Sequence, residues 1–198
     1  MRDVDGITAA GRACLQRQGL PDVVIANAGI SIGVDTAEFE DLDVVRATFE
    51  THNLGLAATF QPFLKPMRDR RSGTLVGIAS MAAIRGLPGH AAYCASKAGV
   101  VAYCESLRGE NRPYGLRVVT LLPGYVATPL TAGNSYPMPF LMTAEDFAAR
   151  AVRAIAAGRS YRVIPWPMAA VAKLLRVLPN GLFDRLLAGR GRKKRQGE

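Results

Sequence analysis

The chain has 198 residues, 49% of them hydrophobic and 21% charged, with a mean hydropathy of +0.10, which is typical of one globular domain with a sizeable core. It shows no apolar run of about 18 residues and no charged-then-apolar leader, so we predict neither a spanning helix nor a signal peptide, and a cytoplasmic location. From Arg150 onward there are 12 Lys or Arg against two acids, so the preceding residues sum to −1, which argues against a nucleic-acid-binding body.

Along the chain, helical and strand patterns alternate. Asp3 is placed to cap a helix over residues 4–18, and Gly19 ends it. Further helices are predicted over 42–67, 93–110 and 143–157, the last starting on a capping box formed by Thr143 and Asp146. Short apolar runs predict strands over 22–26, 74–79, 116–122 and 161–164, and such runs are typical of parallel strands covered on both faces. We therefore expect an α/β fold with a doubly wound parallel sheet.

The C-terminal part is read separately, as residues 166–198 following a domain of residues 1–165. A helical segment over 165–188, kinked at Pro179, has apolar residues on one side of the helix and Lys173 and Arg176 elsewhere. We expect it to pack on the sheet, the substrate cleft or another subunit. The alternative is a weak interfacial membrane contact made with the basic tail by Trp166, Leu182, Phe183, Leu186 and Leu187. The run 190–195 is interpreted as a solvated, frayed terminus.

The cysteines and histidines indicate neither a disulfide framework nor a metal site. Cys14, Cys94 and Cys104 are odd in number and have no Cys-x-x-Cys spacing, so they are interpreted as core residues. His90 and Cys94 lie four positions apart, but two ligands do not make a metal site.

Small and polar residues follow three of the predicted strands. They are Asn27-Ala28-Gly29, Ser80 and Pro123-Gly124. The carboxyl ends of parallel strands meet at one edge of the sheet, which is where ligands bind in such folds. Tyr93 and Lys97 lie four residues apart on the helix that begins beside Ser80, so phenol and ammonium share one helix face. A Tyr-Lys pair alone also occurs by chance in many helices, but its position next to Ser80 favours a site.

These residues resemble the motifs of the short-chain dehydrogenase/reductase family, over most of the chain. Ala26-Asn27-Ala28-Gly29 is similar to the family's Asn-Asn-Ala-Gly motif, and Asn53 to its helix asparagine. Ser80 resembles its serine, Tyr93 and Lys97 its Tyr-x-x-x-Lys pair, and residues 123–128 its Pro-Gly segment. The resemblance implies a Rossmann-like sheet, an NAD or NADP cofactor, an alcohol or carbonyl substrate and a homo-oligomer.

The resemblance also implies a role for each matching residue. Tyr93 transfers a proton, Lys97 lowers the pKa of Tyr93 and holds the nicotinamide ribose, Ser80 binds the substrate oxygen, and Asn53 supports a water. The residues expected to bind the cofactor are Asn27, Ala28, Gly29, Tyr93, Lys97, Pro123, Gly124, Val126 and Thr128. His52, beside Asn53, is interpreted as an ordinary helix residue, and the alternative is that it touches the site.

The family's first βαβ unit, with its Gly-rich phosphate loop, has no counterpart here, because Gly6, Gly11 and Gly19 lack its spacing. Without that unit, the strand containing Val23 and Ile25 is expected to leave an exposed apolar edge. We hypothesise that the chain is an N-terminally incomplete form of a longer enzyme. The alternative is a non-catalytic remnant or partner subunit.

The segment between Thr128 and Thr143 is apolar and rich in proline, from Tyr136 to Met142. It follows the strand end that the resemblance places beside the nicotinamide. We expect a lid over a lipophilic substrate, and the alternative is a loop that only packs.

Overall fold

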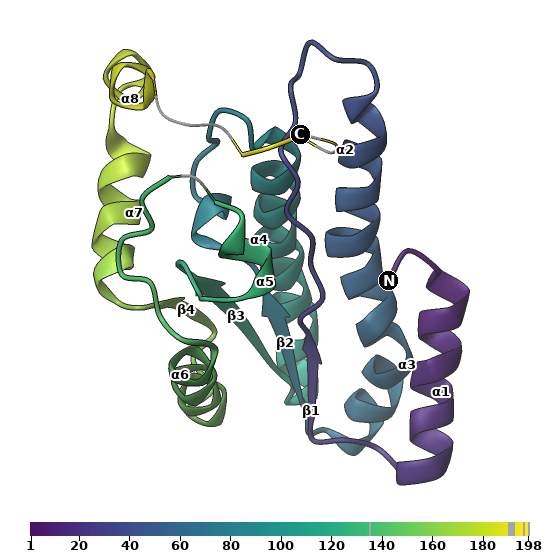
Figure 1. Ribbon diagram of the computed structural model, residues 1–198. Coiled ribbons are helices and arrows are strands. Elements are labelled where there is room, and N and C mark those ends of the chain that lie inside the picture. The colour runs from purple at the N-terminus through teal and green to yellow at the C-terminus, as the bar shows by residue number, and fades with distance from the viewer. Residues whose placement is uncertain (135, 190–192, 196, 198) are drawn as a thin grey trace.

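The computed structural model describes residues 1–134, 136–189, 193–195 and 197, and it contains one parallel sheet (Figure 1). The strand order is β1-β2-β3-β4, so each strand pairs with the next one along the chain. Val24 lies opposite Leu75, which in turn lies opposite Val118. The four strands are β1 Val23–Ala26, β2 Thr74–Ile78, β3 Arg117–Pro123 and β4 Tyr161–Ile164.

Helices form over every predicted range, but a π-helical turn at residues 50–54 divides the predicted 42–67 helix, and the short helices at 81–83, 112–114 and 129–132 are additional. Asp3 caps the first one by accepting a hydrogen bond from the Gly6 amide at 2.9 Å, and Thr143 caps α6 by accepting from the Asp146 amide at 3.1 Å. The helices are α1 Val4–Gln18, α2 Asp41–Phe49, η1 Glu50–Leu54, α3 Gly55–Arg70, η2 Met81–Ala83, α4 Ala91–Asn111, η3 Arg112–Tyr114, α5 Pro129–Ala132, α6 Ala144–Ala156, α7 Pro167–Val177 and α8 Asn180–Leu187. None of the described helices is long and apolar enough to cross a membrane.

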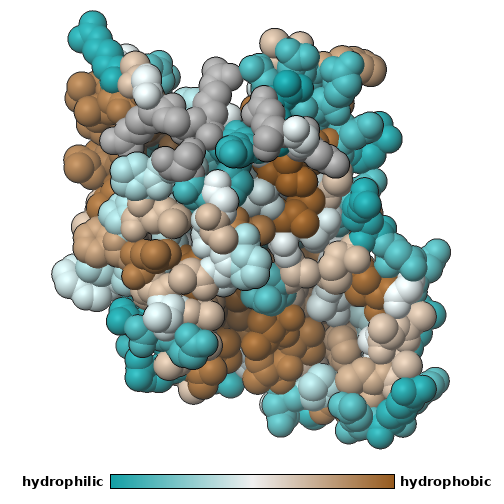
Figure 2. All heavy atoms as spheres, in the orientation of Figure 1, coloured by the Kyte–Doolittle hydropathy of each residue, from teal (hydrophilic) through white to brown (hydrophobic). Residues whose placement is uncertain are grey.

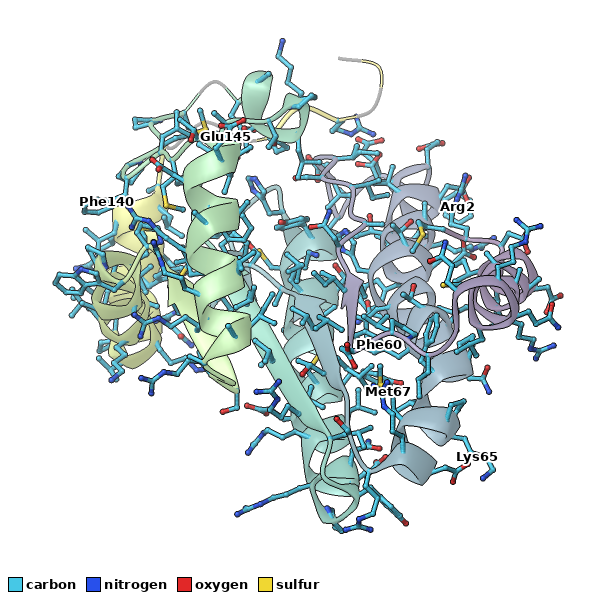
Figure 3. All side chains as sticks on the ribbon, turned by 90° about the horizontal axis from the view of Figure 1, so that it is seen from below. Arg2, Phe60, Lys65, Met67, Phe140 and Glu145 are labelled. Atoms are coloured by element: carbon cyan, nitrogen blue, oxygen red, sulfur yellow. The ribbon has the colours of Figure 1, made fainter. Side chains whose placement is uncertain are left out.

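Helices cover both faces of the sheet, which confirms the doubly wound α/β arrangement. One core cluster joins α3 and α4 to the sheet, and Phe60 and Met67 are fully buried in it. In Figure 3 both side chains point from α3 toward the strands, whereas Lys65 on the same helix points away. The second cluster joins α6 to the opposite face through Val119, Leu121 and Ile155.

The face of the sheet opposite α3 is left open at β1. Val24 and Ala26 are buried, but the alternating residues Val23 and Ile25 are 41% and 49% exposed. Figure 2 shows an apolar patch at this place, between α6 and α1. In the strand order β1 is a terminal strand, so the predicted exposed apolar edge is confirmed.

The C-terminal helices pack on the body of the protein through their inner sides. Met168 of α7 belongs to the first core cluster, and Phe183 of α8 is 6% exposed beneath the Arg85 guanidinium, 3.8 Å from the ring centroid. Arg85 also donates hydrogen bonds to the carbonyl oxygens of Leu175 and Leu178, which hold the α7–α8 turn. The division into residues 1–165 and 166–198 stays a prediction.

The end of the chain differs from the predicted frayed terminus. Residues 190–192 lie outside the described part, but Arg195 forms a two-point ion pair with Asp41, at 2.9 and 3.1 Å. The backbone of Lys194 accepts a hydrogen bond from the Gly33 amide at 2.8 Å. Residues 193–195 therefore lie against the segment that follows β1. They are held there because the nearly buried Asp41 carboxylate, far away in the sequence, pairs with the Arg195 guanidinium.

Candidate active site

Ser80 lies just past the carboxyl end of β2, where the strand passes into a short helical turn. Its backbone is extended, with φ −167° and ψ 157°, and it caps η2. The Ser80 Oγ accepts a hydrogen bond from the Ala82 amide at 3.1 Å, which fixes the direction of the hydroxyl. The side chain is thereby held at the edge of the sheet where ligands bind in parallel α/β folds.

Tyr93 is in the first turn of α4 and its hydroxyl is close to Ser80. Burial raises the pKa of the Tyr93 phenol, and a hydrogen bond with the Ser80 side chain opposes that rise. The two side chains predicted to act on one substrate oxygen therefore lie together. Ser80 comes from the end of a strand and Tyr93 from a helix, so their contact depends on the tertiary fold.

Lys97 follows one turn later on α4 and is only 4% exposed. Its Nζ donates a hydrogen bond to the carbonyl oxygen of Ile78, at 2.8 Å, and lies 5.9 Å from the centroid of the Tyr93 ring. Burial lowers the pKa of Lys97 to about 8, because the charged form loses hydration. The lowering of the Tyr93 pKa by Lys97 stays a prediction, because burial is the larger influence on that pKa and raises it.

Asn53 lies in η1, a π-helical turn between α2 and α3, and faces α4. Its Nδ2 donates to the carbonyl oxygen of Ser96 at 3.0 Å. Its Oδ1 is buried and has no hydrogen-bond partner among the described residues. Gly99 permits the close contact, because a Cβ there would lie 2.6 Å from Asn53 Nδ2. A buried acceptor without a partner among the described residues suits the predicted water, and that role stays a prediction.

The structure contradicts the interpretation of His52 as an ordinary helix residue. It is 2% exposed, and its ring meets the Tyr93 ring edge-on, with centroids 5.6 Å apart at 81°. Its Nε2 accepts from the Ile30 amide at 3.0 Å, and its Nδ1 lies 2.8 Å from Ser96 Oγ. Sequence reasoning missed it because a single histidine on a helix gives no sign of which elements surround it. Its direct neighbour Asn53 was the one available hint.

The loop after β1 brings Asn27, Ala28 and Gly29 to the same edge, where all three are exposed. Gly29 packs closely on the cluster, because a Cβ at this position would lie 3.1 Å from His52 Nε2 and 3.6 Å from Lys97 Nζ. The structure thus brings the predicted loop, lysine and tyrosine together, with His52 between them.

The four residues predicted from the Pro-Gly segment lie at the carboxyl end of β3 and just beyond it. Gly124 donates to the carbonyl oxygen of Ile164 at 2.8 Å, Val126 forms a bridge with Met142, and Thr128 caps α5. Their hydrogen bonds among described residues run to β4 and to the 129–142 segment rather than to Tyr93. Pro123 is the last residue of β3 and pairs with β4.

The 129–142 segment folds back over this edge. Met142 and Tyr125 form a hydrogen bond at its base, at 3.0 Å. The Tyr136 ring lies 5.8 Å from His90 and 6.3 Å from Tyr125, centroid to centroid. Burial raises the pKa of Tyr136 to about 12, and the proximity of Tyr93 adds to the rise. The segment therefore reaches the neighbourhood of Tyr93, with Ser135 outside the described residues.

A parallel, doubly wound sheet with serine, tyrosine and lysine side chains at the carboxyl ends of its strands defines a Rossmann-like α/β protein. The short chain dehydrogenase family model matches residues 1–137, more than half of the chain. The chain belongs to this family.

Relatives and solved structures agree with that assignment. An uncharacterised oxidoreductase of Myxococcus xanthus is 42% identical over 173 residues, which are 87% of this chain and 68% of the relative. The dehydrogenase/reductase SDR family member 7B of Bos taurus is 34% identical, over 100% of this chain and 64% of its own length. A short chain dehydrogenase of Burkholderia cenocepacia, solved in complex with NADP, superposes with a TM-score of 0.80 at 21% identity, covering 96% of this chain and 76% of that structure. The chain thus spans about two thirds of the length of these curated relatives.

Proposed function

We propose that this chain carries the catalytic part of an NAD- or NADP-dependent oxidoreductase that interconverts an alcohol and a carbonyl. The observation that supports it most is that Ser80 lies close enough to the Tyr93 phenol to lower its pKa, with the buried amine of Lys97 one turn away on the same helix. Lys97 is 4% exposed and has no acidic partner among the described residues, and burying such an amine costs stability, so a role in folding alone does not explain it. A site that handles a proton does.

Each side chain then has one task. The Ser80 hydroxyl binds the substrate oxygen and holds it against Tyr93. Tyr93 gives its proton to that oxygen in reduction and takes it back in oxidation. The Lys97 ammonium, when charged, favours the phenolate of Tyr93 and holds the ribose hydroxyls. A bound nicotinamide supplies or accepts the hydride.

The residues present fit the nicotinamide end of such a cofactor. Asn27, Ala28 and Gly29 are exposed, and Gly29 lies beside the Lys97 amine, since a Cβ at this position would be 3.6 Å from Lys97 Nζ. Pro123, Gly124, Val126 and Thr128 are proposed to line the other side, with Tyr93 and Lys97 between. For the pyrophosphate the described residues offer no Gly-rich loop at a helix start, so that end of the cofactor is not assigned to residues of this chain.

The substrate is proposed to be lipophilic, because the segment over the site is apolar. Phe140 and Leu141 are 53% and 47% exposed, while Met142 is buried in the second core cluster. Such a segment favours a long-chain or cyclic carbonyl compound over a short polar one. A lid role predicts that deleting residues 137–141 raises KM for a lipophilic substrate far more than for a small one.

The competing proposal is a non-catalytic remnant or a partner subunit. It is supported by the open face at Val23 and Ile25, which suits contact with another polypeptide. A panel of alcohols and carbonyl compounds, assayed with NADH and NADPH by nicotinamide absorbance, separates the two. Turnover that Ser80→Ala abolishes supports the enzyme. Binding of neither cofactor and no turnover by the purified chain supports the remnant.

We further propose that the outer side of the C-terminal helices contacts an anionic lipid surface. Trp166, Leu174 and Val177 are 69%, 60% and 76% exposed on one side of α7, opposite the packed Met168. Residues 166–198 hold eight Lys or Arg against two acids, which suits anionic lipid better than a second basic copy. Flotation with phosphatidylserine vesicles is expected for the wild type and for Val152→Asp on α6, but not for Leu174→Asp. Light scattering that shows a dimer dissociated by Leu174→Asp would instead assign this surface to a homo-oligomer.

The homo-oligomer and the cytoplasmic location implied by the resemblance are proposals too. Light scattering of the purified wild type measures the first. Cell fractionation measures the second, and the free thiols of Cys14, Cys94 and Cys104 suit a reducing compartment.

A further inference from the structure

His52 is a buried imidazole that the proposed chemistry leaves unused. It lies inside η1, between the loop that follows β1 and the first turns of α4. Both ring nitrogens have partners on different elements, Ile30 on the loop and Ser96 on α4. Each of these elements carries part of the proposed site, the loop with Gly29 and the helix with Tyr93.

The partners fix which nitrogen of His52 carries the hydrogen. A backbone amide can only donate, so the Ile30 N–H at 3.0 Å requires an unprotonated Nε2. On the other side, Ser96 Oγ donates its own hydrogen to the carbonyl oxygen of Tyr93, at 2.9 Å. Ser96 Oγ must therefore accept from His52 Nδ1, 2.8 Å away. The hydrogen bonds run in one direction, from the Ile30 amide through a neutral imidazole and a hydroxyl to the backbone of Tyr93.

Packing supports the same connection. The His52 ring meets the Tyr93 ring edge-on at 5.6 Å, so a shift of the imidazole moves the phenol. A Cβ at Gly29 would come within 3.1 Å of His52 Nε2, so the loop backbone lies directly on the ring. Asn53 Nδ2 holds the Ser96 carbonyl and keeps η1 close to α4.

The neutral state also follows from the surroundings. Burial, together with the positive charge of Lys97, lowers the pKa of His52 to about 3. The ring therefore keeps one donor and one acceptor at every pH at which the protein is expected to work.

We propose that His52 is a positioning residue, whose neutral, Nδ1-protonated imidazole couples the 27–30 loop to Tyr93. Both of its ring nitrogens are bonded within the protein, so its effect is exerted through Ile30 and Ser96. Through Ile30 it holds the loop proposed to contact the nicotinamide, and through Ser96 it holds the backbone of the residue proposed to transfer the proton. The inference rests on the proposed function for its effect on turnover, whereas the hydrogen-bond chain itself does not depend on it.

Two substitutions separate the two connections. The side-chain amide of His52→Asn reaches the position of Nδ1, so it keeps the donor to Ser96 and loses the acceptor for Ile30. The amide of His52→Gln reaches the position of Nε2, so it keeps the acceptor for Ile30 and loses the donor to Ser96. Thr51→Val is the matched control, because among the described residues the Thr51 hydroxyl bonds only to the Ala47 carbonyl of its own helical run.

The experiment has a spectroscopic arm and a kinetic arm. Nitrogen NMR of the 198-residue chain is expected to show Nδ1 protonated and Nε2 bare, and exchange of the Ile30 amide is expected to be about tenfold faster in His52→Asn but unchanged in His52→Gln. In turnover, His52→Asn is expected to raise KM for the cofactor about tenfold with kcat nearly unchanged. His52→Gln is expected to lower kcat about tenfold with that KM nearly unchanged.

The outcomes distinguish the inference from the proposed function. An Nε2-protonated tautomer, a charged imidazole near pH 6, or equal effects of both variants on kcat and KM would overturn the inference. If the wild type shows the predicted tautomer and exchange but no turnover, the positioning chain stands and the proposed function fails. If one variant does not fold, the wild-type tautomer and the other variant still decide the matter.

Discussion

Lys97 donates from Nζ to the carbonyl oxygen of Ile78 at 2.8 Å, which ties α4 to the last residue of β2. That bond draws the ammonium into the edge of the sheet, and burial there lowers the pKa of Lys97 to about 8. Because its pKa is lowered, Lys97 loses its charge more easily than an exposed lysine. Lys97 also lies close to Tyr93, so its protonation affects both the stability of the fold and the chemistry proposed for the site.

The first prediction concerns the cost of burying Lys97. The folded state holds the lysine proton less firmly than the unfolded chain, so the penalty is fully present below pH 8 and is relieved as the pH rises toward 10.5. Between these values the free energy of unfolding of the wild type is expected to rise by about 3 kcal/mol relative to Lys97→Met. Urea unfolding at several pH values measures it, and parallel pH profiles for the two proteins would show that Lys97 is not buried in this way.

The second prediction concerns His52 at acid pH. Its pKa is lowered to about 3 in the folded protein, against 6.5 in an exposed histidine, so the unfolded chain binds the proton first as the pH falls. Stability is therefore expected to decline below pH 6.5, by about 2 kcal/mol at pH 5. His52→Gln is expected to lack this part of the decline in denaturant titrations. An identical acid loss in the variant would contradict a buried neutral imidazole.

The strands and the position of Ser80 at the ligand-binding edge follow from local patterns in the sequence. Short apolar runs locate the strands, and the position of a residue after a strand locates it at the ligand-binding edge. The role of His52 and the docking of Arg195 on Asp41 could not be predicted in the same way. Both depend on a buried partner from a distant element, and the π-helical turn that aims His52 at α4 has no local signature.

The third prediction tests the close packing of η1 on α4. Gly99→Ala places a methyl group 2.6 Å from Asn53 Nδ2, so it is expected to destabilise the protein by about 1–3 kcal/mol. Gly109→Ala on the same helix meets nothing within 4 Å and is expected to stabilise it by up to about 1 kcal/mol. Thermal unfolding compares the two variants. Equal shifts in Tm would mean that Asn53 is not held against α4 as described.

The most direct measurement is the comparison of cofactor binding with turnover in Tyr93→Phe. The substitution removes only the phenol oxygen, so the Tyr93 ring keeps its contact with His52 and the fold is expected to hold. The account predicts that Tyr93→Phe binds NADH or NADPH with nearly the wild-type Kd, while kcat falls by about a thousandfold or more. A variant that retains kcat within about tenfold of the wild type would contradict the assignment of Tyr93 as the proton donor.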